Sequence, residues 1–252
     1  MKDHKLSKNY KFPLGAVFAI LAGIAVVMNL MLYAVQRTAF SIFYFQQAGF
    51  TGLLNSSIYA LLFFAEQTIM LAALLALAVF LILKQRKKIL IALPFAMTVT
   101  YFIAIFSYAL DFISGYNFTF QTLVNIFAYV LSAVSCLLLA VIIIFNSSNR
   151  SNRLAFMPWI APIPAILGHF ILFFISTVNL TSIFYFAMAN ISYSDYFLYA
   201  LSVLLGNVRS VLFYAVFGIL FALTIFFAAR WITNPYKKSS QIEKAESEQI
   251  TE

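Results

Sequence analysis

Long uninterrupted apolar stretches dominate this chain of 252 residues. A helix that crosses a lipid bilayer needs roughly 20 consecutive, mostly apolar residues. The sequence holds six stretches of this kind, and each is predicted to form one membrane-spanning helix. They cover residues 13–35, 58–83, 89–113, 123–145, 154–178 and 205–231. The predicted fold is therefore all-α, a polytopic bundle of six transmembrane helices in a lipid bilayer.

The composition excludes an ordinary soluble domain. Hydrophobic residues make up 63% of the chain and charged residues only 10%, whereas soluble domains have roughly 45–50% and about 25%. No soluble catalytic or nucleotide-binding domain fits between the spans, and the polar segment 236–252 is predicted to be disordered. Any energy for transport would come from an ion gradient, from a separate ATPase or from a second membrane subunit.

The net charge is +8, and the positions of the basic residues along the chain indicate the topology. Basic residues gather at 2–11, at 84–88, at 150–153 and from Arg230 onward. With six spans, all four segments fall on the same side of the membrane. Because positively charged loops stay in the cytoplasm, we expect a plasma-membrane protein with both termini cytoplasmic. The same placement argues against nucleic acid as a partner.

Two connections on the predicted outer side, 38–57 and 179–196, are aromatic and mildly polar. Aromatic side chains gather at the membrane–water boundary, so each connection is expected to form a short interfacial helix. Both contain the pentapeptide SIFYF, at 41–45 and at 182–186. This match indicates either a parallel repeat that relates 13–88 to 154–238 or a chance recurrence in a chain with 29 Phe and 14 Tyr.

Three ionisable residues are predicted to lie deep in the outer half of the bundle. Glu66 is about eight residues into the second span, on the order of 12 Å below the boundary, and His169 lies about as deep in the fifth span. A charge at such depth is costly unless it is paired or faces water. Under the repeat alignment Glu66 falls opposite Gly206, close to Arg209. The three residues are predicted to form one polar cluster.

Nearby polar residues extend this cluster, namely Gln67, Asn207 and Ser210. Two interpretations stay open: an ion or substrate pathway, or a structural ion pair between Glu66 and Arg209 with His169 hydrogen-bonded nearby. Asn29 lies near a predicted helix end and calls for no function.

Three prolines interrupt the fifth predicted span, at Pro158, Pro162 and Pro164. Proline lacks the backbone N–H and clashes with the preceding turn, so this stretch is predicted to break the helix. Broken helices in membranes line substrate sites in some transporters.

No catalytic, metal-binding or cofactor-binding motif stands out, and the sequence designates no catalytic residue, metal site or cofactor. The bundle size, the broken helix and the deep charges favour a transporter, or the permease subunit of a transport system, with a polar site in the outer half. The alternative is a non-catalytic accessory, immunity or sensing protein that binds a partner in the bilayer. An intramembrane enzyme is the weakest hypothesis, because no paired nucleophile and base is visible.

Overall fold

The computed structural model describes residues 13–83, 88–113, 119–147, 156–190 and 197–233. Every element in these ranges is helical. In chain order the elements are α1 (Leu14–Ile82), the 3₁₀ helix η1 (Lys88–Ile91), α2 (Ala92–Ile113), α3 (Phe120–Ser147), α4 (Met157–Ile160), α5 (Ile163–Asn190) and α6 (Phe197–Thr233). The predicted all-α fold is confirmed.

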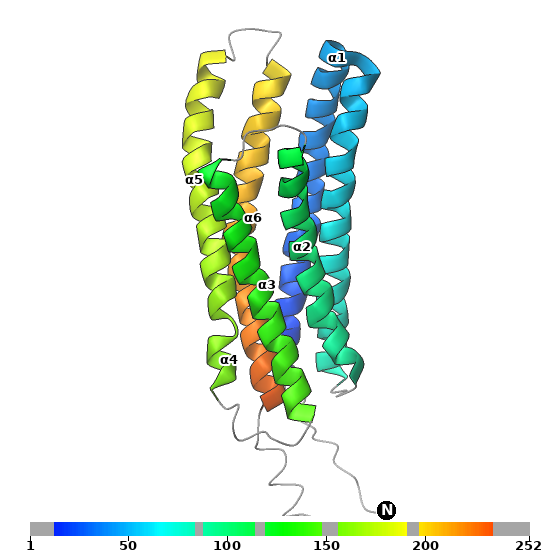
Figure 1. The fold of residues 1–252 in the computed structure, drawn as a ribbon, viewed down its shortest axis with the longest axis vertical. Helices are drawn as coiled ribbons and strands as arrows, with labels where there is room; N and C mark the ends of the chain where they lie inside the picture. The colour runs from blue at the N-terminus through cyan, green and yellow to red at the C-terminus, as the bar shows by residue number, and fades with distance from the viewer. Residues whose placement is uncertain (1–12, 84–87, 114–118, 148–155, 191–196, 234–252) are drawn as a thin grey trace, which may run out of the picture.

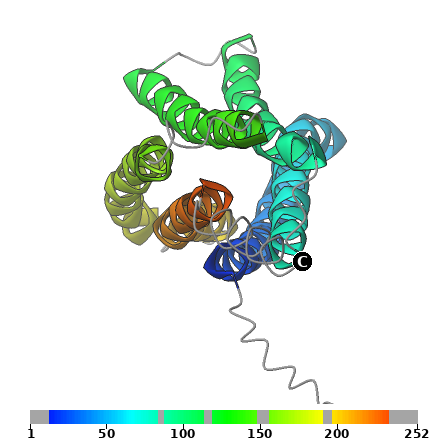
Figure 2. The same cartoon turned by 90° about the horizontal axis from the view of Figure 1, so that it is seen from below.

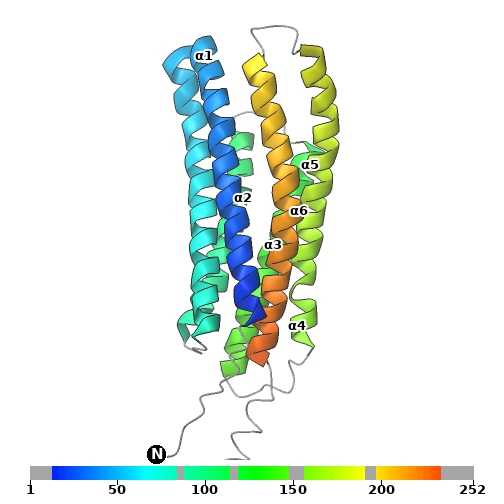
Figure 3. The same ribbon diagram turned by 180° about the vertical axis from the view of Figure 1, so that it is seen from behind.

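The helices run along the long axis of the molecule, and α1 turns back on itself to form two antiparallel arms (Figures 1 and 3). Helix α1 begins, and α6 ends, at the end of the bundle that we call proximal. The opposite end, where α1 turns back, is called distal. Six helical segments are long and apolar enough to cross a membrane in the described part of the chain. The chain is thus a multi-pass membrane protein.

The helix neighbours close into a ring. Helix α1 packs against α2, α2 against α3, α3 against α5, α5 against α6, and α6 returns to α1. Seen along the bundle, the helices surround a central region, and α6 lies between α5 and the first arm of α1 (Figure 2). Helix α6 also contacts α3 across the ring. This closure brings side chains from every long helix toward one interior.

The membrane-compatible segments extend well beyond three predicted bounds. The first runs to Ile42, the fifth runs to Tyr185, and the last begins at Tyr199. Gln36, which directly follows the first predicted span, lies within α1. A Cβ atom on Gly206 of α6 would lie 2.5 Å from the side-chain nitrogen of Gln36. Polar groups that find protein surroundings do not end a membrane helix.

Both aromatic outer connections are helical where they are described, but as extensions of the spans. Helix α1 stays helical through 43–57, and α5 continues to Asn190. In the two halves of the predicted repeat, 13–88 and 154–238, the two arms of α1 meet at the distal end, and α5 ends and α6 begins at that same end (Figure 1). Their relation by a repeat stays a prediction. The segment 236–252 and most of the basic residues used for topology lie outside the described residues.

Close contacts between backbones hold α1 and α5 in the ring. A Cβ atom on Gly15 would lie 3.1 Å from the backbone nitrogen of Ala228 in α6. A Cβ atom on Gly168 of α5 would lie only 2.4 Å from the carbonyl oxygen of Ala128 in α3. Small residues at such crossings let membrane helices approach closely. The α3–α5 crossing therefore tolerates no side chain at Gly168.

Candidate functional site

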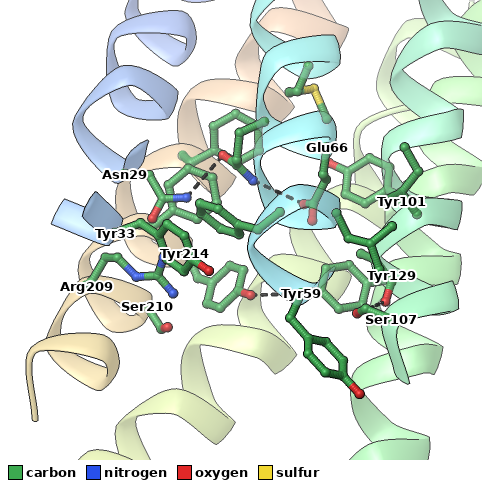
Figure 4. A pocket seen from close by; sticks show the side chains of 18 of the residues that line it. Asn29, Tyr33, Tyr59, Glu66, Tyr101, Ser107, Tyr129, Arg209, Ser210 and Tyr214 are labelled. Carbon is green, nitrogen blue, oxygen red and sulfur yellow. Dashed lines mark hydrogen bonds between the residues drawn. The ribbon is translucent and has the colours of Figure 1, made fainter. Parts of the chain in front are cut away.

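The helices of the ring surround a partly open cavity of about 330 Å³ with many polar side chains in its lining. Glu66, on the second arm of α1, lines it eight residues from the start of that span at Ile58. At 1.5 Å per residue this is on the order of 12 Å from the distal end of the span. The polar residues of the lining are Asn29, Tyr33, Tyr59, Glu66, Gln67, Tyr101, Ser107, Tyr108, Tyr129, His169, Arg209, Ser210 and Tyr214. The cavity thus holds ionisable groups inside the membrane-spanning part of the bundle (Figure 4).

A chain of amide hydrogen bonds joins the two arms of α1 to the carboxyl group. The Asn29 side-chain nitrogen donates to Gln67 Oε1 at 3.1 Å, and Gln67 Nε2 donates to Glu66 Oε1, also at 3.1 Å. Asn29 and Gln67 are 5% and 4% exposed. The prediction that Asn29 lies near a helix end is therefore wrong. It lies in the middle of the span Leu14–Ile42 and is linked to Glu66 through Gln67.

Arg209 of α6 lines the cavity and contacts two aromatic rings. Its guanidinium carbon is 4.9 Å from the ring centroid of Tyr33 and 4.9 Å from that of Phe63. These two rings are themselves stacked, with centroids 4.0 Å apart. Cation–π contacts of this kind are stronger where water is excluded. The rings therefore hold the guanidinium plane in place without a carboxylate.

The predicted ion pair between Glu66 and Arg209 does not form. No salt bridge within 4.0 Å joins them, and Arg209 Nε and Nη1 are buried with no hydrogen-bond partner among the residues described. Both side chains face the same cavity, with Arg209 beside Tyr33 and Glu66 beside Tyr101 (Figure 4). The sequence argument placed the two charges at similar depth. It could not foresee that aromatic rings occupy the position of a counter-ion.

Tyrosines form most of the remaining polar wall. The hydroxyl groups of Tyr129 and Tyr214 are hydrogen-bonded at 2.7 Å, which links α3 to α6. Tyr101 of α2 is 3% exposed, and its hydroxyl group, although near Ser132, makes no hydrogen bond within the described part of the chain. A buried polar group without a partner costs free energy. The Tyr101 hydroxyl and the Arg209 N–H groups together give the cavity unused hydrogen-bonding capacity.

His169 lines the same cavity from α5 and is only 3% exposed. Its Nδ1 lies 2.9 Å from the carbonyl oxygen of Ala165, so Nδ1 carries the hydrogen and donates it. The ring packs among Tyr101, Phe217 and Phe221, with centroid distances of 6.2, 5.4 and 5.7 Å. His169 is therefore held by its own helix and by aromatic rings. It makes no contact that couples it directly to Glu66 or Arg209.

Asn207 and the three prolines lie outside the cavity lining. The Asn207 amide donates to the carbonyl oxygen of Val203 in its own helix, at 2.9 Å. The helix is interrupted at Ala161 and Pro162, between α4 and α5. This interruption is near the proximal end (Figure 1). By contrast, the lining residues Glu66 and Tyr129 are eight and nine residues from the distal ends of their spans, at Ile58 and Phe120. The helix break therefore does not line the site.

Ser135 of α3 satisfies the backbone at this break. Its Oγ donates to the carbonyl oxygen of Ala161 at 2.6 Å and accepts from the N–H of Ala165 at 2.7 Å. In a regular helix these two backbone groups would bond to each other. The hydroxyl group is inserted between them, and sequence reasoning missed it because Ser135 lies far away in the chain.

Sequence reasoning also missed the tyrosines. Tyr101, Tyr129 and Tyr214 are far from the helix ends, whereas tyrosine in membrane proteins prefers the interface. Their position within apolar spans was a signal of a polar interior. No group of three or more His, Cys, Asp or Glu residues placed to hold a metal ion occurs among the described residues. Cys136 is buried and free.

Comparison with known proteins assigns no relative. No protein-family model matches the chain, and no curated protein or solved structure is significantly similar to it.

Proposed function

We propose that this chain is a membrane transport protein, either a self-contained transporter or the permease subunit of a transport system, and that it binds a small polar molecule in this cavity. The observation that carries the proposal is a cavity lined by the half-buried side chains of Glu66 and Arg209 and by the buried His169, inside six membrane-spanning helices. Polar and ionisable residues at membrane depth are expensive and mark substrate or ion pathways. The cavity volume of about 330 Å³ is at the small end of the range for small-molecule sites.

Unused hydrogen-bonding groups support binding over a purely structural role. A network that only locks helices together would pair its charges with each other. Here Arg209 Nε and Nη1 and the Tyr101 hydroxyl group lack partners in the described structure. A ligand or water in the cavity would satisfy them. In this proposal the distal end faces the outside of the plasma membrane, both termini are cytoplasmic, and the substrate enters from the distal end.

Cysteine accessibility tests the proposal, because the only cysteine of the chain is Cys136, which is fully buried. In a Cys136→Ala background, Ser107→Cys places one thiol in the cavity wall. The control is Ser202→Cys, at a buried position of α6 that does not line the cavity. Each variant is treated with the membrane-impermeant thiol reagent MTSET, added separately to either side of oriented vesicles.

A transporter exposes its site alternately to both sides, so the Ser107→Cys thiol should be modified from the distal side and also, in part of the population, from the proximal side. Ser202→Cys should stay unmodified. Modification from one side only, under all conditions, would contradict transport and favour a binding or sensing protein. Modification from neither side would contradict a solute-accessible cavity altogether.

A further inference from the structure

The two oppositely charged residues of the cavity, Glu66 and Arg209, are held by separate sets of contacts. Glu66 is tied to the amide chain through Gln67, and Arg209 lies on the stacked rings of Tyr33 and Phe63. Neither charge is in a salt bridge with the other, although both line the same cavity. The position of each group is therefore fixed independently, with cavity space available to both.

Arg209 offers an anion site. Two of its N–H-bearing nitrogens are buried without a partner, so their capacity to donate hydrogen bonds is unused among the described residues. Guanidinium groups bind carboxylate and phosphate through such in-plane N–H groups. Ser210, the next residue, also lines the cavity. In Figure 4 Ser210 lies beside Arg209, toward the side of the cavity where Tyr33 is found.

Glu66 offers a cation site among aromatic rings. Tyr101 and Tyr129 line the same part of the cavity (Figure 4), and Tyr129 is hydrogen-bonded to Tyr214. Aromatic faces combined with a carboxylate attract ammonium groups, including quaternary ones. No lysine lines the cavity, and Glu66 makes no salt bridge among the described residues. The protein thus supplies no cation in contact with this carboxylate.

From this arrangement we infer that the cavity binds a small zwitterion, with its acidic group on Arg209 and its cationic group between Glu66 and the tyrosines. The inference rests on the proposed function and adds the chemical class of the ligand. A ligand with a single charge would satisfy one site and leave the other charge unpaired in a low-dielectric interior, which is unfavourable. A free amino-acid-like solute and a zwitterionic lipid headgroup share the required chemistry.

Protection of the Ser107→Cys thiol against MTSET measures ligand binding directly. Five probes are compared: trimethylglycine and glycine as free zwitterions, glycerophosphocholine as a headgroup zwitterion, and acetate and tetramethylammonium as single charges. We expect at least one zwitterion to protect at a concentration about tenfold lower than either single-charge probe, as the loss of one charged contact implies. Protection by trimethylglycine or glycine indicates a free solute. Protection by glycerophosphocholine alone indicates a lipid headgroup.

Charge variants assign the two ends of the ligand. Glu66→Gln should raise the half-protecting concentration of the zwitterion about tenfold without weakening acetate, and Arg209→Gln should do the same without weakening tetramethylammonium. Asn207→Ala, two residues from Arg209 and outside the lining, is the matched control and should change neither value. If a charge variant does not fold, the comparison of the five probes on the protein that keeps both Glu66 and Arg209 still tests the inference.

Failure of the inference is distinguishable from failure of the proposed function. A thiol that reacts but is protected equally by single charges and zwitterions, or by no probe, leaves an accessible cavity and overturns the zwitterion. In that case water bridges the two charges. A thiol that reacts from neither side overturns both.

Discussion

Replacing Ser135 with alanine removes the hydroxyl group that joins α3 to the break before α5. This group donates to the carbonyl oxygen of Ala161 at 2.6 Å and accepts from the N–H of Ala165 at 2.7 Å. All three residues are fully buried. In Ser135→Ala both backbone groups lose their partner at once. Water has no open route to them, because this face of the break is packed against α3.

The expected loss follows from these two contacts. One buried group without a partner costs about 1–3 kcal/mol, so two groups set an upper range of roughly 2–6 kcal/mol. Side-chain hydrogen bonds in membrane proteins average only about 0.6 kcal/mol, and the ladder can partly close again. We therefore expect about 2 kcal/mol, a fall in Tm of roughly 4–8 °C for a protein of this size.

Ser202→Ala is the matched control. It is the same substitution at another fully buried serine, but the Ser202 hydroxyl donates only to the carbonyl oxygen of Tyr199 in its own helix, at 2.8 Å. That carbonyl keeps its place in the helix, so we expect a loss below about 0.5 kcal/mol.

Thermal unfolding in mild detergent, followed by tryptophan fluorescence, compares the two variants. Trp159 lies in α4 against Phe226, with ring centroids 4.9 Å apart, and reports the break itself. Hydrogen exchange at Ala165 gives a second measure, because its amide should lose protection in Ser135→Ala. Equal Tm values for Ser135→Ala and Ser202→Ala, with the Ala165 amide still protected, would refute the bridging role of this hydroxyl group.

Three other predictions follow from packing and burial. Gly168→Ala should cost about 1–3 kcal/mol in thermal unfolding, because its Cβ would lie 2.4 Å from a backbone carbonyl oxygen of α3. Gly23→Ala should cost far less, because its nearest neighbour is the end of a flexible leucine side chain at 3.3 Å. Tyr129→Phe and Tyr214→Phe should each destabilise the folded protein, because the two hydroxyl groups are hydrogen-bonded to each other at 2.7 Å. A double-mutant cycle should give a coupling free energy of about 0.5–1.5 kcal/mol. Cys136 should resist maleimide in the folded protein and react once denaturant unfolds it, because it is fully buried.

Each of these predictions has a result that contradicts it. Equal losses at Gly168 and Gly23 would show that α3 and α5 separate easily. Additive effects at Tyr129 and Tyr214 would mean that their hydroxyl groups do not interact. Rapid maleimide labelling of native Cys136 would show that the core around it is open.

The sequence predicted the fold well because a single physical requirement dominates it. A lipid-spanning helix must be apolar over most of its length, and this pattern is visible without any knowledge of tertiary contacts. Helix ends were harder to place. The first span was predicted to end at 35, whereas the membrane-compatible segment continues to Ile42, and the last was predicted to begin at 205 but begins at Tyr199. Only the packed structure reveals these bounds.

The candidate site was predicted in part, for a related reason. Glu66, Gln67, His169 and Arg209 line one cavity, because charged or polar residues in apolar spans must turn inward. Asn207 does not line it, since its amide bonds to its own helix. Periodicity and depth can show which residues turn inward. They cannot show which group each residue will meet there.

The separation of Glu66 and Arg209 argues that the cavity is maintained by its aromatic walls. Two opposite charges in an apolar interior attract strongly, and flexible side chains would collapse into contact unless something opposed it. The stacked pair of Tyr33 and Phe63 holds the guanidinium, while the amide of Gln67 holds the carboxyl group. A bundle stabilised by a direct ion pair would need neither device. The observed arrangement costs unpaired N–H groups on Arg209, and a ligand that bridges the two charges would remove that cost.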